Sequence, residues 1–161
     1  MSKTTTEIVD AVTGGRRLRR NRRFSWTRRL VQENRLSADD LILPLFLMEG
    51  SDCEEPIKAM PGIARYSVDR AVAVTARAQA LGIPAVAPFP NVAQDKRDQT
   101  GSEIINPDNL ICQFTRAAKA AVPDIGIITD AALDPFTDHG HDGVLRDGII
   151  VNDESVSQIV L

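Results

Sequence analysis

The chain has 161 residues, a net charge of −3 and 43% hydrophobic residues, a composition typical of one globular domain and not of a disordered chain. No apolar run approaches the ~18 residues that a membrane-spanning helix needs, and the polar first ten residues lack the apolar segment of a secretory signal. Two cysteines, Cys53 and Cys112, are too few for a disulfide framework or a zinc cluster. We therefore expect a protein of the reducing cytoplasm with no membrane partner.

Basic residues are concentrated at the N-terminus. Residues 1–36 hold ten basic residues against three acidic ones, so this segment carries +7 and the remainder carries −10. Arginines surround Phe24 and Trp26, a pattern typical of segments that contact phosphates and stack on bases. The same pattern fits an arm that docks on an acidic surface of its own oligomer, because the rest of the chain is acidic. We divide the chain into a basic arm, residues 1–36, and a body, residues 37–161.

The body alternates strand-like and helix-like segments. Continuous apolar runs, typical of buried parallel strands, occupy residues 41–47, 85–90 and 125–130. Helical patterns follow these runs, at residues 68–81, 108–122 and 153–161. We expect Pro107 in the first turn of the second helix, and Asn152 or Asp153 as the N-cap of the third.

This alternation predicts an α/β fold with a parallel sheet and right-handed crossovers. A (β/α)8 barrel belongs to this class but takes about 250 residues, so the chain would hold only about its first three βα units. We therefore expect residues 37–161 to be the N-terminal part of an incomplete barrel.

The loop after the third predicted strand carries the residues best suited to chemistry. Asp130 ends that strand, and active-site groups of parallel α/β folds lie at the carboxyl ends of strands. Both histidines, His139 and His141, follow in the same loop among further aspartates. Carboxylates and imidazoles at this spacing could bind a divalent metal or act as acid and base, whereas a solvated loop would use its aspartates for turns. The position after a strand favours the functional interpretation.

The stretch DAALDPFTDHGHDG, residues 130–143, closely resembles the metal-loop signature of the delta-aminolevulinic acid dehydratases, or porphobilinogen synthases. The resemblance continues in collinear order at residues 16–23, 43–46, 60–62, 101–103, 122–123 and 152–154. It implies a TIM barrel with an N-terminal arm that wraps a neighbouring subunit, usually in a homo-octamer. It also implies a lyase that condenses two molecules of 5-aminolevulinate to porphobilinogen in tetrapyrrole and haem biosynthesis. With this family in view, docking within a homo-oligomer is the preferred role of the arm, and nucleic acid is a less favoured partner.

The resemblance also assigns roles to the loop. Zinc-type members carry three cysteines at positions that are Ala132, Asp134 and Asp142 in this sequence. Carboxylate oxygens prefer harder cations than thiolates do, so the loop indicates magnesium, or no active-site metal at all, and argues against zinc. Asp130 is then the candidate active-site carboxylate, and Asp134 and Asp142 are candidate metal ligands or simply acidic active-site residues.

One part of the family's machinery has no match in this chain. The resemblance implies Schiff-base lysines in the second half of the barrel, and none of the four lysines here, Lys3, Lys58, Lys96 and Lys119, falls at the end of a predicted strand. Lys96 and Arg97 could approach substrate carboxylates, although a solvated charged loop explains them better. We therefore expect a fragment that lacks the Schiff-base lysines and is inactive alone. The alternatives are a non-catalytic truncated paralogue acting as an assembly or interaction module, and a nucleic-acid-binding module.

Overall fold

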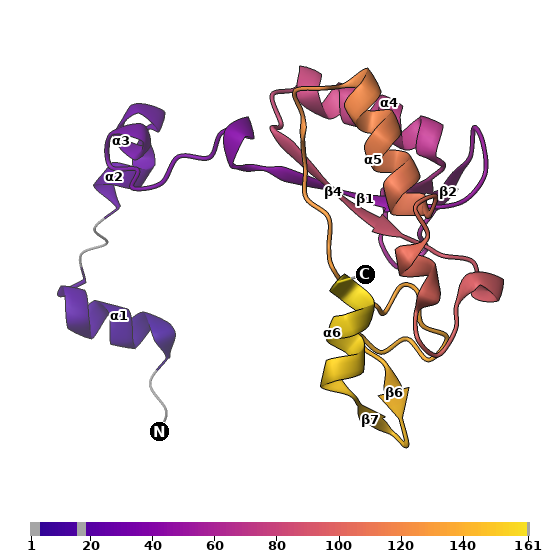
Figure 1. Cartoon of the computed structure of the whole chain (residues 1–161). Helices are drawn as coiled ribbons and strands as arrows, with labels where there is room; N and C mark the ends of the chain where they lie inside the picture. The colour runs from indigo at the N-terminus through magenta and orange to yellow at the C-terminus, as the bar shows by residue number, and fades with distance from the viewer. Residues whose placement is uncertain (1–3, 16–18, 161) are drawn as a thin grey trace. The chain divides into compact units, whose positions relative to one another are not determined.

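The computed structural model describes residues 4–15 and 19–160 (Figure 1). The chain divides after residue 36 into two units, and each is considered by itself. The described residues of the first unit form three short helices, α1 (Thr5–Thr13), α2 (Arg20–Arg23) and α3 (Ser25–Leu30). Lys3 and residues 16–18 lie outside the described residues. Among the described residues, no helix is both long and apolar enough to cross a membrane.

Helix α1 carries its own start and stop signals. The Thr4 hydroxyl accepts a hydrogen bond from the Glu7 N–H, and the Glu7 carboxylate accepts one from the Thr4 N–H at 2.7 Å, which completes a capping box. The helix ends at Gly14, whose φ of 60° is the left-handed conformation that glycine adopts most readily. The sequence reading did not predict this helix, although the Thr4–Glu7 spacing contains the signal.

The arm exposes its large apolar side chains. Phe24 is 49% exposed and Trp26 is 61% exposed, while Leu30 is more exposed still. Only Thr27 is buried among the arm residues described, and its hydroxyl donates to the Phe24 carbonyl at 2.8 Å. The described part of the arm therefore lacks an apolar core of its own.

The body is built on a five-stranded sheet with the order β2-β3-β1-β4-β5. The strands are β1 (Ile42–Leu47), β2 (Glu54–Pro56), β3 (Ala64–Tyr66), β4 (Ala85–Pro90) and β5 (Gly126–Ile127). β1 pairs in parallel with β3 and β4, β4 pairs in parallel with β5, and β2 is antiparallel to β3. The structure thus confirms the parallel α/β class and the first two predicted strands. β2 and β3 have three residues each, too few for an alternating pattern to show in the sequence.

Helices α4 (Val68–Ala80) and α5 (Leu110–Ala121) cover one face of this sheet (Figure 1). The core lies between these two helices and the sheet. It includes Leu45, Leu47, Val86, Phe114 and Ala118. Because side chains alternate along a strand, the opposite face carries a second apolar set. We call it the open face and define it by Ile42, Phe46, Phe89 and Ile128.

The second predicted helix begins later than expected. α5 starts at Leu110 with Asn109 as its N-cap, so Pro107 precedes the helix instead of lying in its first turn. The Asn109 side chain accepts from the Cys112 N–H and donates to the Ile104 carbonyl, both at 2.9 Å. The Asn106 side chain instead accepts the Asp108 N–H at 3.0 Å in a turn before the helix, so the second asparagine, Asn109, is the cap.

The last helix also differs from the prediction at its start. α6 (Asn152–Val160) already includes Asn152, and the Ser155 N–H bonds to the Val151 carbonyl, so neither Asn152 nor Asp153 is the N-cap. The preceding loop contains an unpredicted hairpin of β6 (Leu145–Arg146) and β7 (Ile149–Ile150). Its turn is Asp147–Gly148, with φ angles of 50° and 78°, the Asp-Gly signal of a tight hairpin. The described residues also form three short 3-10 helices: η1 (Ala38–Asp40), η2 (Gln94–Lys96) and η3 (Ser102–Ile105).

Replacing Phe114, which is fully buried in the core, with alanine should lower the free energy of unfolding by about 3–5 kcal/mol, because the site cannot collapse around the missing ring. Urea denaturation followed by circular dichroism measures this loss. Leu81→Ala is the control, since Leu81 is 64% exposed and its truncation should cost no more than about 0.5 kcal/mol. Equal losses for the two variants would contradict the placement of the core.

Candidate active site

A cavity of about 300 Å³ lies beyond the carboxyl ends of β4 and β5. Its lining combines the end of β4, the segment after β5 and the start of α5, and includes Phe89, Asn109, Cys112, Asp130, Asp134 and Phe136. We call it the β4–β5 pocket. Parallel α/β folds bind ligands at this end of the sheet, where the strand ends present loop residues to a common space. The pocket is mostly apolar and holds two carboxylates, so it combines an apolar surface with groups that can donate or accept protons.

A larger hollow of about 950 Å³ lies within the arm unit. Four arginines, Asn21 and Thr27, together with Phe24, Trp26 and Leu30, line it. It contains no carboxylate, imidazole or thiol, the groups from which acid–base or nucleophilic sites are usually built. We therefore assign the candidate chemistry to the β4–β5 pocket.

Asp130 lines this pocket, but it does not end a strand as the sequence predicted. Only Gly126 and Ile127 pair with β4, and one further bond, from the Ile128 N–H to the Val86 carbonyl, prolongs the contact. Asp130 follows in an irregular segment with an exposed side chain. The predicted strand 125–130 is therefore much shorter than its apolar pattern indicated.

Asp134 lines the same pocket and its protonation is perturbed. Partial burial raises the pKa of Asp134, and the negative charges of Asp142 and Asp130 raise it further. Arg97 opposes this effect with its positive charge. Asp134 thus lies within electrostatic range of the other two predicted site aspartates. A carboxyl group with a raised pKa is better able to carry a proton near neutral pH than an ordinary aspartate is.

Asp142 has a different position. Its carboxylate accepts the Leu133 N–H at 2.7 Å, and Leu133 is fully buried. Asp142 is not among the residues that line the pocket. It therefore closes the loop on which Asp134 lies, and it acts on Asp134 through its charge.

Backbone hydrogen bonds join the segment around Asp98 to the loop that carries Asp134. The sequence did not predict this contact. The Asp98 N–H donates to the Phe136 carbonyl, and the Asp138 N–H donates back to the Asp98 carbonyl. The Asp98 carboxylate accepts hydrogen bonds from Thr100 and Ser102. Burial alone would raise the pKa of Asp98, but these hydrogen bonds outweigh it and hold the pKa well below its usual range. The signal in the sequence was Asp98 followed by hydroxyl residues at the spacing of an Asx turn.

The two histidines lie beside each other and outside the pocket lining. Their ring centroids are 5.4 Å apart, and the His139 Nδ1 accepts the His141 N–H at 3.2 Å. The His141 carbonyl accepts the hydroxyl of Thr137, which is fully buried. The histidines therefore help to shape the loop, and the structure does not place them with Asp130 and Asp134 in one site.

A model of the delta-aminolevulinic acid dehydratase family matches residues 15–161. The chain belongs to this family. It is 54% identical over 144 residues to the delta-aminolevulinic acid dehydratase of Bradyrhizobium diazoefficiens, a match that covers 89% of this chain and 41% of that protein. It is 40% identical over 148 residues to the enzyme of Chlamydia pneumoniae, covering 92% of this chain and 45% of that one.

A solved structure agrees with the sequence comparison. The Toxoplasma gondii delta-aminolevulinic acid dehydratase, in complex with the reaction product porphobilinogen, superimposes with a TM-score of 0.82 at 39% identity. The match covers 89% of this chain and 41% of the Toxoplasma chain. The chain therefore spans less than half the length of these relatives, as an N-terminal portion of this TIM-barrel family.

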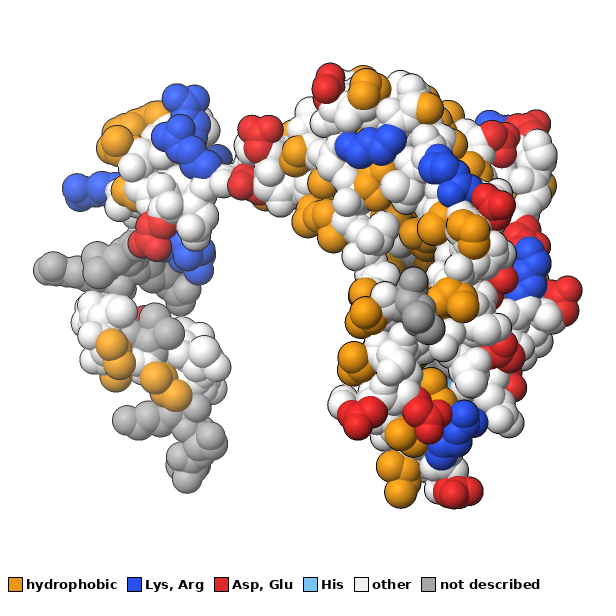
Figure 2. Space-filling model, in the orientation of Figure 1, with side chains coloured by type: hydrophobic (Ala, Val, Ile, Leu, Met, Phe, Trp, Pro, Cys, Tyr) orange, Lys and Arg blue, Asp and Glu red, His pale blue; other side chains and the backbone are white. Residues whose placement is uncertain are grey.

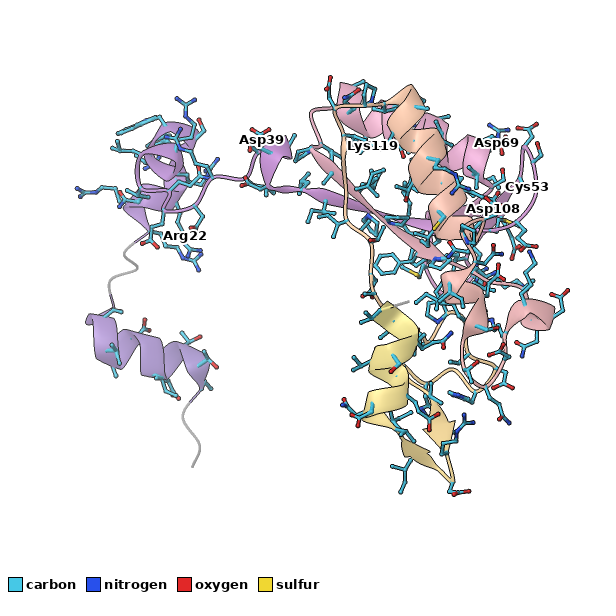
Figure 3. The ribbon with its side chains drawn as sticks, in the orientation of Figure 1. Arg22, Asp39, Cys53, Asp69, Asp108 and Lys119 are labelled. Atoms are coloured by element: carbon cyan, nitrogen blue, oxygen red, sulfur yellow. The ribbon has the colours of Figure 1, made fainter. Side chains whose placement is uncertain are left out.

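The described lysines have structural partners or lie away from the pocket. The Lys96 ammonium pairs with Glu49 at 2.5 Å, and Lys119 at the end of α5 donates to the carbonyls of Pro123 and Ile125 (Figure 3). Neither these two nor Lys58 lines the β4–β5 pocket. Arg97 donates two hydrogen bonds to the Val92 carbonyl, from Nε at 2.9 Å and from Nη2 at 2.7 Å. These contacts therefore favour the interpretation of Lys96 and Arg97 as parts of a charged loop and not as substrate-binding residues.

Asp142→Asn should lower the pKa of Asp134, because it removes a neighbouring negative charge while its amide oxygen still accepts the Leu133 N–H. Carbon-13 NMR titration of the side-chain carboxyl groups measures the change. Asp138→Asn, an exposed position in the same loop, is the control and should leave the titration of Asp134 unchanged. An identical Asp134 titration in Asp142→Asn and the unsubstituted chain would show that the two carboxylates do not interact.

Proposed function

We propose that this chain provides the N-terminal half of a porphobilinogen synthase active site, in an enzyme that condenses two molecules of 5-aminolevulinate. The observation that carries the proposal is the presence of Asp130 and Asp134 in one pocket beyond the carboxyl ends of parallel strands, in a member of this family. The product complex of the Toxoplasma relative supports the same reaction. A non-catalytic interaction module is not favoured, because the chain keeps the acidic loop and the pocket that it lines.

The pocket residues supply acid–base and positioning chemistry. The condensation releases two waters, so protons must move to and from the reacting atoms. Asp134, with its raised pKa, is suited to give and take a proton, and Asp130 supplies a second carboxylate in the same space. Phe89 and Phe136 give the pocket apolar walls beside these two carboxylates. The family resemblance assigns the Schiff-base amine to lysines outside this chain.

We propose that the active-site loop has no zinc and uses magnesium or no metal. Among the described residues, no three His, Cys, Asp or Glu side chains are placed to hold an ion together. Magnesium keeps several of its waters and needs only one or two protein carboxylates, which Asp134 and Asp142 could provide. A bound cation would supply a positive charge that polarises a substrate oxygen.

We further propose that the arm mediates a homo-oligomer, an octamer in the family, and that the protein works in the cytoplasm. Exposed Phe24 and Trp26 beside arginines give the arm apolar anchors and a charge opposite to that of the body. The free thiols of Cys53 and Cys112 fit a reducing compartment. Nucleic acid remains the less favoured partner.

Residues 1–161 fused to the part of the Bradyrhizobium enzyme that follows its matched segment should form porphobilinogen from 5-aminolevulinate. In this fusion Asp130→Asn should lower kcat by about 10²–10⁴-fold, because an amide cannot exchange a proton. Asp124→Asn, an exposed position after α5, is the control and should keep full activity. A soluble, folded fusion without activity, or an Asp130→Asn variant with full activity, would contradict the proposal.

Activity of the fusion should persist after treatment with a zinc-selective chelator, because the loop offers oxygen ligands and no thiolates. The matched control introduces Ala132→Cys, Asp134→Cys and Asp142→Cys together, which should give the loop affinity for zinc. A colorimetric assay for porphobilinogen before and after chelation, with metal analysis, measures both effects. Complete loss of activity in the unsubstituted fusion, restored by zinc alone, would overturn the assignment of the loop.

Deleting residues 1–30 from the fusion should reduce its sedimentation coefficient, because the arm anchors the assembly. Trp26→Ala should weaken assembly by about 1–3 kcal/mol if the exposed ring is buried by a neighbouring subunit. Analytical ultracentrifugation at several salt concentrations measures both, and buried anchors should be less sensitive to salt than rim charges. An unchanged sedimentation coefficient in the deletion, with tight salt-sensitive binding of the intact arm to duplex DNA, would favour the nucleic-acid role.

A further inference from the structure

Asp134 lies in a tight turn of the loop after β5. The N–H groups of Phe136 and Thr137 both donate to the Leu133 carbonyl, at 2.9 and 3.0 Å. These bonds close residues 133–137, which we call the 133–137 turn, into a compact unit. Leu133 and Thr137 are fully buried and keep the two ends of this turn in the interior. The position of Asp134 in the β4–β5 pocket therefore depends on what holds the turn in place.

Asp98 holds this turn through its backbone. The Asp98 N–H donates to the Phe136 carbonyl at 3.3 Å, and the Asp138 N–H donates to the Asp98 carbonyl at 3.0 Å. These two bonds pair Asp98 with Thr137 as in a parallel sheet. The pairing couples the position of the loop after β5 to the conformation of the segment around Asp98.

Gly101 brings the same segment into close contact with the turn. Its φ of 68° lies in the left-handed region that favours glycine. A Cβ at this position would lie 3.2 Å from the Leu133 Cδ2 and 3.4 Å from the Phe136 Cβ. Because the two segments are packed this closely, a change in the shape of residues 98–102 has to move the 133–137 turn as well.

The Asp98 carboxylate sets the shape of residues 98–102. One oxygen accepts the Thr100 N–H at 2.8 Å, the Thr100 hydroxyl at 2.9 Å and the Ser102 N–H at 3.2 Å, and the other accepts the Ser102 hydroxyl. Burial alone would raise the pKa of Asp98, but these bonds outweigh it and hold the pKa below its usual range. Both oxygens are occupied in this way, and Asp98 is not among the residues that line the pocket. Asp98 therefore shapes the site without touching what the pocket binds.

The segment before Asp98 is anchored to the loops after β1 and β4. The Lys96 ammonium pairs at 2.5 Å with Glu49, which follows β1. Figure 2 shows basic and acidic side chains close together on the surface of the body. Arg97 donates twice to the carbonyl of Val92, which follows β4 and is buried. Asp98 thus connects the loop after β5 to a segment that two other loops already hold.

We propose that Asp98 is a positioning residue that fixes where Asp134 stands beside Asp130 in the β4–β5 pocket. Its carboxylate shapes residues 98–102, and the contacts with the 133–137 turn transmit that shape to Asp134. The inference rests on the proposed function for the role of Asp134 in moving a proton. A reacting group misplaced by about 1 Å loses on the order of 100-fold in rate. Because Asp98 does not line the pocket, its loss should lower kcat and leave KM nearly unchanged.

Two substitutions at Asp98 separate positioning from charge. Asp98→Ala removes every bond of the carboxylate. Asp98→Asn keeps an oxygen for the Thr100 and Ser102 N–H groups, and its NH2 group can donate to the Ser102 hydroxyl. In the fusion with the Bradyrhizobium part, Asp98→Ala should lower kcat by about 10–100-fold and change KM by less than about threefold. Asp98→Asn should keep kcat within about threefold of the unsubstituted fusion, because the shape of residues 98–102 is preserved.

Amide hydrogen exchange of the 161-residue chain tests the positioning independently of activity. In Asp98→Ala the N–H groups of Phe136 and Thr137 should exchange about tenfold faster, and in Asp98→Asn their rates should stay within about threefold. Asp69→Ala is the matched control, because the Asp69 carboxylate also organises a loop, by accepting the Asp52 N–H at 2.9 Å, and lies outside the pocket lining. It should change neither these exchange rates nor kcat. Circular dichroism of each variant establishes that it keeps the fold.

The outcomes separate this inference from the proposed function. Unchanged kcat in Asp98→Ala would overturn the positioning role, whether or not exchange becomes faster. Equal losses of kcat in Asp98→Ala and Asp98→Asn would overturn it too, because they would assign the effect to charge. A loss of kcat/KM that comes from KM alone would place Asp98 in substrate binding instead. An inactive unsubstituted fusion would count against the proposed function, while faster exchange in Asp98→Ala that Asp98→Asn does not share would still support the hold of Asp98 on the turn.

Gly101→Ala tests the same contact from the other residue that makes it, and it decides the matter if Asp98→Ala does not fold. The added methyl group would meet the Leu133 side chain and push on the 133–137 turn. A folded Gly101→Ala fusion should therefore also lose kcat with little change in KM. Full kcat in that variant would show that the turn does not depend on residues 98–102, and would overturn the inference.

Discussion

The body depends on the parallel pairing of β1 with β4, which runs in register from Ile42 opposite Ala85 to Leu47 opposite Pro90. This register places Leu45, Leu47 and Val86 under the two helices. A slip of one residue would move a whole set of side chains to the other face and leave α4 and α5 without a core to cover. The same register brings the end of β4 next to the segment after β5, and the β4–β5 pocket lies there.

The site aspartates are held together against their mutual repulsion. Their closeness is imposed by hydrogen bonds of the backbone, from Leu133 to Asp142 and between the Asp98 and Phe136 segments. The positive charge of Arg97 offsets part of the repulsion. Natural proteins tolerate such local conflict where function needs it, and the surrounding packing supplies the stability. The fully buried Leu133 and Thr137 make that contribution here.

Sequence patterns located the elements whose signals are local. The β1 and β4 runs, the Ala-rich α4 and the parallel class follow from residue periodicity, and α5 was placed with its start two residues early. The short strands β2 and β3 show no alternating pattern of apolar residues. The length of β5 depends on how many of its residues pair with β4, which local sequence does not determine. Asp130 and Asp134 of the predicted aspartates line the pocket and Asp142 does not, while Asn109, Cys112 and Phe89 joined the pocket only through the fold. The spacing of Asp134 and Asp142 does not predict their separate roles. These roles differ because the Leu133 N–H donates to Asp142, a contact that only the folded loop creates.

Helix α1 has a consequence for how the arm can be observed. It lies before the family-matched region, has only nine residues, and leaves Ile8 and Val12 one turn apart and exposed. Isolated helices shorter than about 12 residues are marginal in water even with good caps. The fraction of time that α1 spends helical is therefore set by whatever surface covers Ile8 and Val12. Amide-exchange rates of residues 8–13 therefore report whether another surface contacts this end of the chain.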